Sequence, residues 1–305
     1  MRLLILLTLF TGLAVADPAP IIRVTLLGTG TPLLSDVRMS AGLMVEAGGE
    51  VLLFDCGRGI PVRLSQAGPN YPAVNQLFLS HLHSDHTEGI PDLWTSGWPY
   101  RWDQPLNVYG PGLGPDQPVG TAGMMSRIPA AWATDVHIRR DLIDHFPDAG
   151  IAINTTEISE GVVYLKNGVK VTAFKVDHRP VDPAFGYRVD YQGHSMVYSG
   201  DTRPSANLVT FALGTDVLIH EVYGYPTTTP QAAYHTTPEQ AAGVFNQVRA
   251  KLAVYTHLAT PEKDSVTIQR TRAAGYAGPL VVGRDLMRID IFANRVQVPE
   301  SGERE

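Results

Sequence analysis

The feature that most constrains this chain is the hexapeptide His81-Leu82-His83-Ser84-Asp85-His86, which follows a short apolar run. It places three imidazoles and one carboxylate within six residues, and imidazole is the commonest metal-binding side chain in proteins. Because alternate residues leaving a strand project to the same side, His81 and His83 can hold one ion. Asp85 and His86 follow after the chain has turned, so they can face a second ion. The hexapeptide therefore predicts a two-metal site, since one tetrahedral structural zinc needs fewer ligands from so short a segment.

Short apolar runs alternate with turn-forming residues along the rest of the chain. Predicted strands lie at 23–27, 42–46, 51–55, 76–80, 106–109, 162–165, 169–176, 186–191, 195–199, 216–220, 252–256, 280–282 and 288–292. Many of these runs are apolar throughout, which indicates sheets covered on both faces. The clearest helix begins after Thr237, the expected N-cap, with Pro238 as its first residue and Gln240 as the capping-box partner. Two β-rich halves flanked by helices predict an α/β protein built as an αββα sandwich.

Metal-ligating residue types also recur at strand ends. His178, Asp201, His220 and His257 each stand at or just after the end of a predicted strand, as His81 does. In open α/β sheets, active sites form where strand ends gather, so we expect these segments to converge on one edge. For His220 a structural place at the strand end is favoured over a ligand role.

The N-terminus and the net charge narrow the functional class. A basic residue, an apolar run and a small-residue cleavage pattern predict a signal peptide at 1–16. We therefore expect an exported protein, periplasmic or secreted, with no membrane span, and a single domain over 17–305. The formal net charge of −6 at pH 7 is opposite in sign to that of most nucleic-acid binders. This balance favours a small-molecule substrate.

With these features the chain resembles the metallo-β-lactamase superfamily and, within it, the branch of ribonuclease Z-like and arylsulfatase-like hydrolases. The hexapeptide matches the superfamily's HxHxDH signature. The other matching segments follow in the family's order: 27–32, 54–57, 177–178 with 185–188, 199–202, 220–221, 235–237 and 256–258. Because the resemblance covers nearly the whole mature chain, it implies the metallo-β-lactamase fold.

The resemblance also implies roles for individual residues. It implies two metal sites bridged by one carboxylate, with His81, His83 and His178 on one metal, Asp85, His86 and His257 on the other, and Asp201 between them. Two zinc ions are expected, although Mn or Fe also suits His and Asp ligands. Adjacent cations lower the pKa of a bound water, so a metal-bound hydroxide is the expected nucleophile, oriented by Asp85. His235 would serve the leaving group, with Glu221 as its orienting carboxylate. The resemblance makes a homodimer possible.

Parts of ribonuclease Z that hold RNA are missing from the sequence. Some members carry a Gly/Pro-rich arm between the third histidine and the bridging aspartate, but His178 and Asp201 are only 23 positions apart here. The basic loop that senses the tRNA 3′ end is also absent. We therefore do not expect tRNA as the substrate.

An aromatic-rich insertion is expected at about 94–161, which contains all four tryptophans. Trp98 and Trp102 are predicted to line an apolar substrate pocket, because aromatic side chains form such walls. The other interpretation is that the tryptophans pack an inserted subdomain or a dimer interface. A pocket wall would favour a substrate with an apolar or aryl portion.

The sequence thus predicts an exported binuclear metal-dependent hydrolase of small esters, with phosphodiester or aryl-sulfate-type substrates ahead of others. The His235 and Glu221 pair favours this class over the alternative of a lactonase or β-lactamase. A non-catalytic metal-binding protein on a hydrolase fold is the alternative from another class. Asp55 is expected either to cap local amides or to support the metal-binding histidines.

Overall fold

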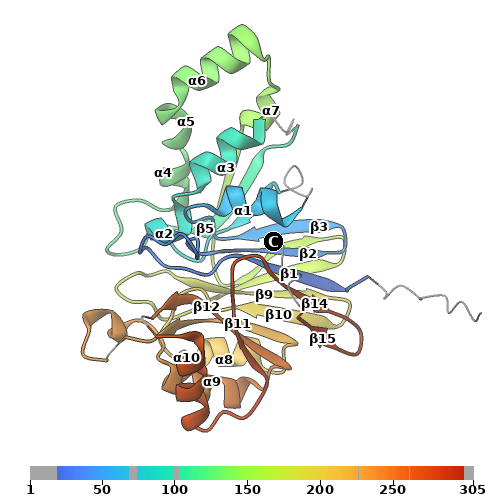
Figure 1. Cartoon of the computed structure of the whole chain (residues 1–305). Coiled ribbons are helices and arrows are strands. Elements are labelled where there is room, and N and C mark those ends of the chain that lie inside the picture. Colours follow the sequence, from blue (N-terminus) through green and yellow to red (C-terminus); the bar gives the residue numbers. More distant parts are fainter. Residues whose placement is uncertain (1–18, 69–73, 99–102, 226, 261, 299–305) are drawn as a thin grey trace, which may run out of the picture.

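The computed structural model describes residues 19–68, 74–98, 103–225, 227–260 and 262–298. Over these residues two β-sheets face each other, with helices on both outer faces (Figure 1). This arrangement confirms the predicted αββα sandwich. Within the same ranges, no helix is both long enough and apolar enough to cross a bilayer.

The first sheet contains eight strands within the described ranges, in the order β15-β14-β1-β2-β3-β4-β5-β6. These strands are β1 (Ile22–Gly28), β2 (Gly42–Ala47), β3 (Glu50–Phe54), β4 (Gln76–Phe78), β5 (Leu106–Pro111), β6 (Ile153–Ile158), β14 (Met287–Ile291) and β15 (Val296–Gln297). Pairing is antiparallel from β15 to β3 and parallel from β3 to β6. Strands β1, β3 and β4 therefore end at the same edge, where Gly28 closes β1, Asp55 follows β3 and His81 follows β4.

The second sheet contains seven strands of the described chain, in the order β13-β12-β11-β10-β9-β8-β7. These strands are β7 (Gly161–Lys166), β8 (Val169–Lys175), β9 (Phe185–Tyr191), β10 (His194–Tyr198), β11 (Val217–Tyr223), β12 (Leu252–Ala259) and β13 (Leu280–Val282). Pairing is antiparallel from β7 to β10 and parallel from β10 to β13. Strands β8, β10 and β12 consequently share a direction, so the segments that carry His178, Asp201 and His257 meet at one edge.

The core lies between the sheets and continues beneath the helices. Val24 and Phe54 of the first sheet pack in one buried cluster with Tyr187 and Ile219 of the second. Further apolar clusters lie on the outer face of each sheet, under the helices. Both sheets are thus covered on two faces, which explains why their strands read as continuous apolar runs.

Helices of the first half cover the first sheet, and helices of the second half cover the second (Figure 1). Those of the first half are α1 (Ile60–Ala67), α2 (Ser84–Thr87), α3 (Ile90–Gly97), α4 (Thr121–Met125), α5 (Ile128–Ala131), α6 (Ala133–His137), the π-helical turn η3 (Ile138–Ile143) and α7 (Asp148–Ile151). Those of the second half are α8 (Ala206–Ala212), the 3-10 turn η4 (Pro230–Ala233), α9 (Pro238–Val248) and α10 (Asp264–Ala273). The capping box predicted for α9 is confirmed: Gln240 N donates to Thr237 Oγ1 at 3.3 Å, and Thr237 N donates to Gln240 Oε1 at 2.9 Å.

The segment 94–161 belongs partly to the sandwich. It contributes β5 and β6 to the first sheet, and α4 packs against these two strands, whereas α5 and α6 extend away from the sheets (Figure 1). Strand β6 was not predicted, because its sequence, Ile153-Asn154-Thr155-Thr156-Glu157-Ile158, is polar in the middle. The two-residue strand β15 was not predicted either.

Candidate metal centre

The structure brings all seven predicted metal ligands together at one edge of the sandwich. Two groups form, and within each group the ligand atoms lie within 4.8 Å of one another: His81, His83, His178 and Asp201 in the first, and Asp85, His86 and His257 in the second. A third group, Asp201, His235 and His257, overlaps both. Segments far apart in the sequence therefore converge on a single centre.

A change of backbone conformation divides the hexapeptide between the two groups. His83 has an extended backbone (φ −63°, ψ 150°) and is the N-cap of α2. Asp85 and His86 lie in the helical turn that follows, and both are buried. The extended part thus supplies His81 and His83 to the first group, and the turn supplies Asp85 and His86 to the second.

The Oδ2 atom of Asp201 lies between the two groups. It is 3.9 Å from His81 Nε2 and 4.0 Å from His178 Nε2, and it is 3.5 Å from His86 Nε2 and 3.3 Å from His257 Nε2. One carboxylate oxygen therefore faces imidazole nitrogens of both groups. This is the position that a ligand shared by two metal ions requires.

The chemistry of the first group fits a cation. His81 Nε2 and His83 Nδ1 are 3.0 Å apart, and His178 Nε2 is 3.5 Å from the same His83 nitrogen. Burial lowers the pKa of His81 and His83, and burial also lowers the pKa of His178 to about 4. Neutral imidazoles direct lone pairs into the space between them, and a metal ion is the natural partner of such lone pairs.

The second group carries an excess of negative charge that a cation would neutralise. Burial of His86 disfavours its charged form, but the nearby carboxylates of Asp201, Asp55 and Asp85 outweigh burial and raise its pKa well above the ordinary value. Three buried polar atoms of the centre have no hydrogen-bond partner in the described chain: His86 Nε2, Asp201 Oδ1 and His257 Nδ1. Buried polar groups are rarely left unpaired, so these atoms also fit a metal-binding role.

Asp55 lies against the candidate ligand His86 and also binds a backbone amide, so both contacts considered for it occur. Its Oδ2 lies 2.8 Å from His86 Nδ1 and accepts hydrogen bonds from Ser80 Oγ at 2.7 Å and Tyr198 OH at 2.8 Å. Its Oδ1 accepts from Ser80 N at 2.7 Å. A carboxylate on the far nitrogen fixes the ring of a metal-binding histidine and leaves its Nε2 for the metal.

Sequence reasoning did not identify Ser80 and Tyr198 as parts of the centre. Ser80 Oγ also lies 3.0 Å from His81 Nδ1, so it contacts both Asp55 and a predicted ligand. The position of Ser80 directly before the hexapeptide is a weak signal for this role. Tyr198 lies 143 positions from Asp55 and carries no local signal, because only the packing of the two sheets brings them together.

His235 and Glu221 form a buried pair beside the ligands. His235 Nδ1 lies 2.8 Å from Glu221 Oε1, which also accepts a hydrogen bond from Thr202 N at 3.0 Å. Burial of the ring disfavours its charge, but Glu221 and then Asp201 outweigh burial and raise the pKa of His235 to about 9. The ring centroids of His235 and His257 are 5.6 Å apart. The pair thus places an imidazole, whose charged form Glu221 favours, beside the candidate ligands.

His220 has the structural place expected for it. Its Nδ1 lies 2.7 Å from the carbonyl oxygen of Glu221, and its ring packs edge-on against Phe245. It belongs to none of the ligand groups in the described chain.

The predicted pocket wall does not form around Trp98. Its side chain is 2% exposed and packs against Trp94, with ring centroids 4.8 Å apart, in the apolar cluster under the helices of the first sheet. This burial leaves no face of the indole for a substrate, which agrees with the packing interpretation. Trp102 lies outside the described residues.

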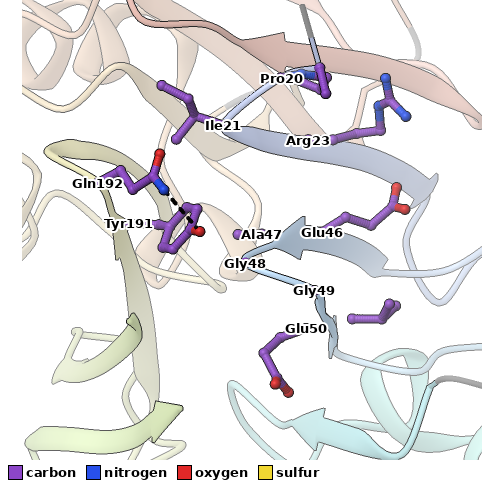
Figure 2. Close-up of a pocket in the computed structure, with 12 residues that line it drawn as sticks. Pro20, Ile21, Arg23, Glu46, Ala47, Gly48, Gly49, Glu50, Tyr191 and Gln192 are labelled. Atoms are coloured by element: carbon purple, nitrogen blue, oxygen red, sulfur yellow. Dashed lines mark hydrogen bonds between the residues drawn. The ribbon is translucent and has the colours of Figure 1, made fainter. Parts of the chain in front are cut away.

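Two cavities differ in their relation to the centre. The larger one, of about 550 Å³, lies where β1 begins and at the β2–β3 and β9–β10 turns (Figure 2). From the strand directions, this edge of the sandwich is opposite to the one that carries the candidate ligands. The charged side chains of this cavity are partnered: Arg23 with Asp290 at 2.7 Å, and Glu50 with Tyr164 OH at 2.6 Å. A smaller cavity of about 200 Å³ is lined by residues that include Leu258, which follows His257 in the sequence, but by none of the candidate ligands.

Comparison with known proteins agrees with this fold and site. The family described as "Beta-lactamase superfamily domain" matches residues 51–258. A ribonuclease Z of Mycobacterium avium is 36% identical over 288 residues, which cover 89% of this chain and 99% of that protein. The metallo-beta-lactamase fold protein YhfI of Bacillus subtilis shares the fold with a TM-score of 0.68 and 18% identity, over 88% of this chain and 98% of that one. The short form of human tRNase Z gives a TM-score of 0.66 and 24% identity, over 88% and 99% of the two chains.

The fold and the clustered ligands define a hydrolase of the metallo-β-lactamase fold. More specifically, the chain belongs to the beta-lactamase superfamily and to its ribonuclease Z-like branch. The resemblance found in the sequence is thereby confirmed.

Proposed function

We propose that this protein is a binuclear metal-dependent phosphodiesterase that acts on small diesters. The observation that carries the proposal is the position of Asp201 Oδ2 between two groups of ligands, with the His235–Glu221 pair alongside. The relative named ribonuclease Z supports phosphodiesters over aryl sulfates, because a ribonuclease cleaves phosphodiester bonds. Histidine and aspartate ligands suit zinc, and Mn or Fe also suits them.

Each group of the centre has a task in such a reaction. Two cations held there would supply Lewis acidity, which lowers the pKa of water and offsets charge on a phosphoryl oxygen. Asp85 Oδ2, 3.0 Å from His257 Nε2, faces the shared space and can orient the attacking water by accepting its hydrogen bond. His235 can deliver a proton to the leaving oxygen, while Glu221 holds its ring in place.

A substrate panel tests the proposal. Protein loaded with zinc, manganese or iron is assayed on bis-p-nitrophenyl phosphate, p-nitrophenyl sulfate, an acyl-homoserine lactone and a cephalosporin, and its metal content is measured. We expect two metal equivalents and the highest kcat/KM on the phosphodiester, with Asp85→Asn losing about 100-fold or more. The matched control His194→Gln changes a histidine that lies by Asp216, away from the ligand groups, and is expected to retain activity.

Two results would overturn the proposal. Turnover of only the lactone or only the cephalosporin would assign the chain to those hydrolases. Two bound metal equivalents with no turnover of any substrate would favour a non-catalytic metal-binding protein.

Processing of precursor tRNA is the second candidate, favoured by the name of the M. avium relative and by its 99% coverage. Against it, β9 and β10 are joined by the two residues Gln192 and Gly193, so no arm lies between His178 and Asp201. The net charge of −6 also opposes RNA binding. Cleavage of a precursor tRNA with a higher kcat/KM than bis-p-nitrophenyl phosphate would replace the small-diester assignment.

Export is part of the proposal and rests on residues 1–16, which lie outside the described ranges. Expression of the full sequence in a bacterium with a periplasm, followed by fractionation and intact mass measurement, tests it. A periplasmic protein that begins at Asp17 is the expected product. A cytoplasmic protein with an intact N-terminus would contradict it.

A further inference from the structure

The candidate metal centre reaches solvent at His83. Six of the seven candidate ligands are buried, whereas His83 is exposed. The ring of His83 packs against that of His178, with centroids 5.2 Å apart, and the ring of His235 lies 5.1 Å from the same His178 ring. A substrate that enters at His83 therefore arrives next to His235, the candidate proton donor.

Tyr234 packs against two of these rings. Its ring meets His178 edge-on, with centroids 5.3 Å apart and planes at 81°, and it meets His235 at a tilt of 49°, with centroids 4.9 Å apart. The carbonyl oxygen of Tyr234 lies 3.0 Å from Nδ1 of His178, so its backbone is also held against a candidate ligand. The side chain of Tyr234 thus borders both a ligand of the first group and the candidate proton donor.

The ring of Tyr234 is the accessible one beside His235. Four rings contact His235 in the part of the chain that the structure describes: His178, Tyr223, Tyr234 and His257. Three of them offer little surface, because His178 is 1% exposed, Tyr223 6% and His257 3%. Tyr234 is half-buried. Within the described chain, a group bound against His235 therefore has Tyr234 as the aromatic surface open to it.

The leaving group of a diester is expected to lie close to this ring. A general acid works within hydrogen-bond reach of the oxygen to which it delivers a proton. The group attached to that oxygen then extends from His235, and the ring of Tyr234 borders its path. Aromatic rings attract each other in offset or edge-to-face arrangements, in addition to the effect of the apolar area that they bury. An aromatic leaving group would thus gain a contact that an aliphatic one lacks.

From these contacts we propose that Tyr234 is a specificity-determining residue that binds an aromatic leaving group beside His235. The inference rests on the proposed phosphodiesterase function, in which His235 is the proton donor, and deepens it by naming the leaving group. The enzyme would cleave small diesters of a phenol-type alcohol in preference to diesters of an aliphatic alcohol of the same acidity.

The kinetic test compares methyl phenyl phosphate with methyl hexafluoroisopropyl phosphate. Phenol and hexafluoroisopropanol are of similar acidity, so the two leaving groups differ mainly in whether they present an aromatic ring. For the metal-loaded wild type we expect kcat/KM to be about tenfold higher for the phenyl diester. Tyr234→Leu should bring this ratio close to one, and Tyr234→Phe, which keeps the ring, should retain it. Tyr191→Leu changes a half-buried tyrosine of β9 at the larger cavity and should leave the ratio at its wild-type value.

Binding provides a readout that does not depend on turnover. Methyl benzylphosphonate carries a methylene group in place of the leaving oxygen, and methyl isobutylphosphonate presents a branched alkyl group instead of the ring. Calorimetry of both compounds with the metal-loaded wild-type and variant proteins gives their Kd values. We expect the benzyl compound to bind about tenfold more tightly to the wild type and to Tyr234→Phe, and to lose this advantage in Tyr234→Leu.

The outcomes separate this inference from the proposed function. Turnover of the diesters with the same ratio in the wild type and Tyr234→Leu would overturn the role of Tyr234 and leave the phosphodiesterase proposal standing. A preference lost in Tyr234→Phe as well would also overturn it, because the hydroxyl group and not the ring would then be responsible. No turnover, with a benzyl preference in Kd that Tyr234→Leu removes, would uphold the ring contact and overturn the phosphodiesterase proposal. Equal Kd values of the two phosphonates in the wild type would overturn the ring contact even if Tyr234→Leu does not fold.

Discussion

The Oδ2 atom of Asp55 lies 2.8 Å from Nδ1 of His86, and neither side chain is exposed to solvent. This contact fixes the ring so that Nε2 faces the second group of ligands. Asp55 itself is held by Ser80 and Tyr198, which join the first sheet to the second at this point. The geometry of the metal centre therefore depends on residues that bind no metal themselves.

Asp55→Asn should weaken metal binding. An amide in place of the carboxylate removes the negative charge that supports His86, so we expect metal affinity to fall about 10- to 100-fold. Competition with a chromophoric chelator measures the change. Asp103→Asn, at an exposed position, is the matched control and should bind metal as the wild type does. Equal affinities in all three proteins would show that Asp55 only supports the local backbone.

Glu221→Gln should affect substrates with poor leaving groups most. A neutral amide no longer favours the protonated form of His235, and a general acid matters more when the leaving oxygen is more basic. We expect kcat to fall about 100-fold for a phenyl leaving group and less than about tenfold for p-nitrophenyl. The same loss on both leaving groups would contradict a role of His235 as an acid. Glu239→Gln, on α9, is the control.

Removal of metal should destabilise the fold. The buried carboxylates of Asp85 and Asp201 lie 3.0 and 3.3 Å from the same His257 nitrogen, and without metal they would lose the cations that neutralise them. At free zinc about 1,000 times Kd, we expect binding to add about 4 kcal/mol to the free energy of unfolding. Thermal unfolding in chelator and in a series of zinc buffers measures this. A melting temperature that does not change with zinc concentration would argue against a metal site in the folded protein.

Gly57→Ala should disturb the position of Asp85. A Cβ at Gly57 would overlap the carbonyl oxygen of Asp85 and come within 2.7 Å of Ser40 Cβ, so the backbone of α2 must move. We expect a loss of about 1–3 kcal/mol in stability together with lower metal occupancy. Gly243→Ala is the control, because a Cβ meets nothing within 4 Å there and alanine favours the helix. Full metal occupancy in Gly57→Ala would refute the predicted shift of Asp85.

Asp216 should make stability depend on pH at a site remote from the metal ligands. Burial of its carboxyl favours the neutral form, but Lys251 at 2.6 Å and the amide of Ser195 at 2.8 Å outweigh burial and lower its pKa. Because the pKa of Asp216 in the folded state is lower than the unfolded value of 3.8, its ionised carboxylate stabilises the fold above that pH. This stabilisation is lost as the pH falls through the folded-state pKa.

Chemical denaturation of Asp216→Asn at several pH values measures this contribution. We expect a loss of about 1–3 kcal/mol at pH 6, and a smaller difference from the wild type as the pH falls below about 4. The exposed Asp116→Asn variant is the control. A difference that stays constant from pH 6 to pH 3 would contradict a depressed pKa of Asp216.

Local sequence patterns predict most of the strands and the side chains that cluster as candidate metal ligands. Runs such as 169–176 are apolar because both faces of their sheet are covered, so their pattern is local and readable. The hexapeptide and the later motifs can also be recognised from short segments, because each places its candidate ligands at a fixed spacing after a strand. Strand β6 was not predicted from such a pattern, because it is an edge strand of the first sheet and its middle residues are polar.

The contacts that support these parts, and the surroundings of each side chain, depend on tertiary packing. The contact of Tyr198 with Asp55, the burial of Trp98 and the cavity beside Leu258 all join residues that are distant in sequence or depend on packing between layers. An aromatic residue has the same local pattern whether it lines a pocket or fills a core. Its environment is set by the elements that pack against it, and for Trp98 those elements exclude solvent.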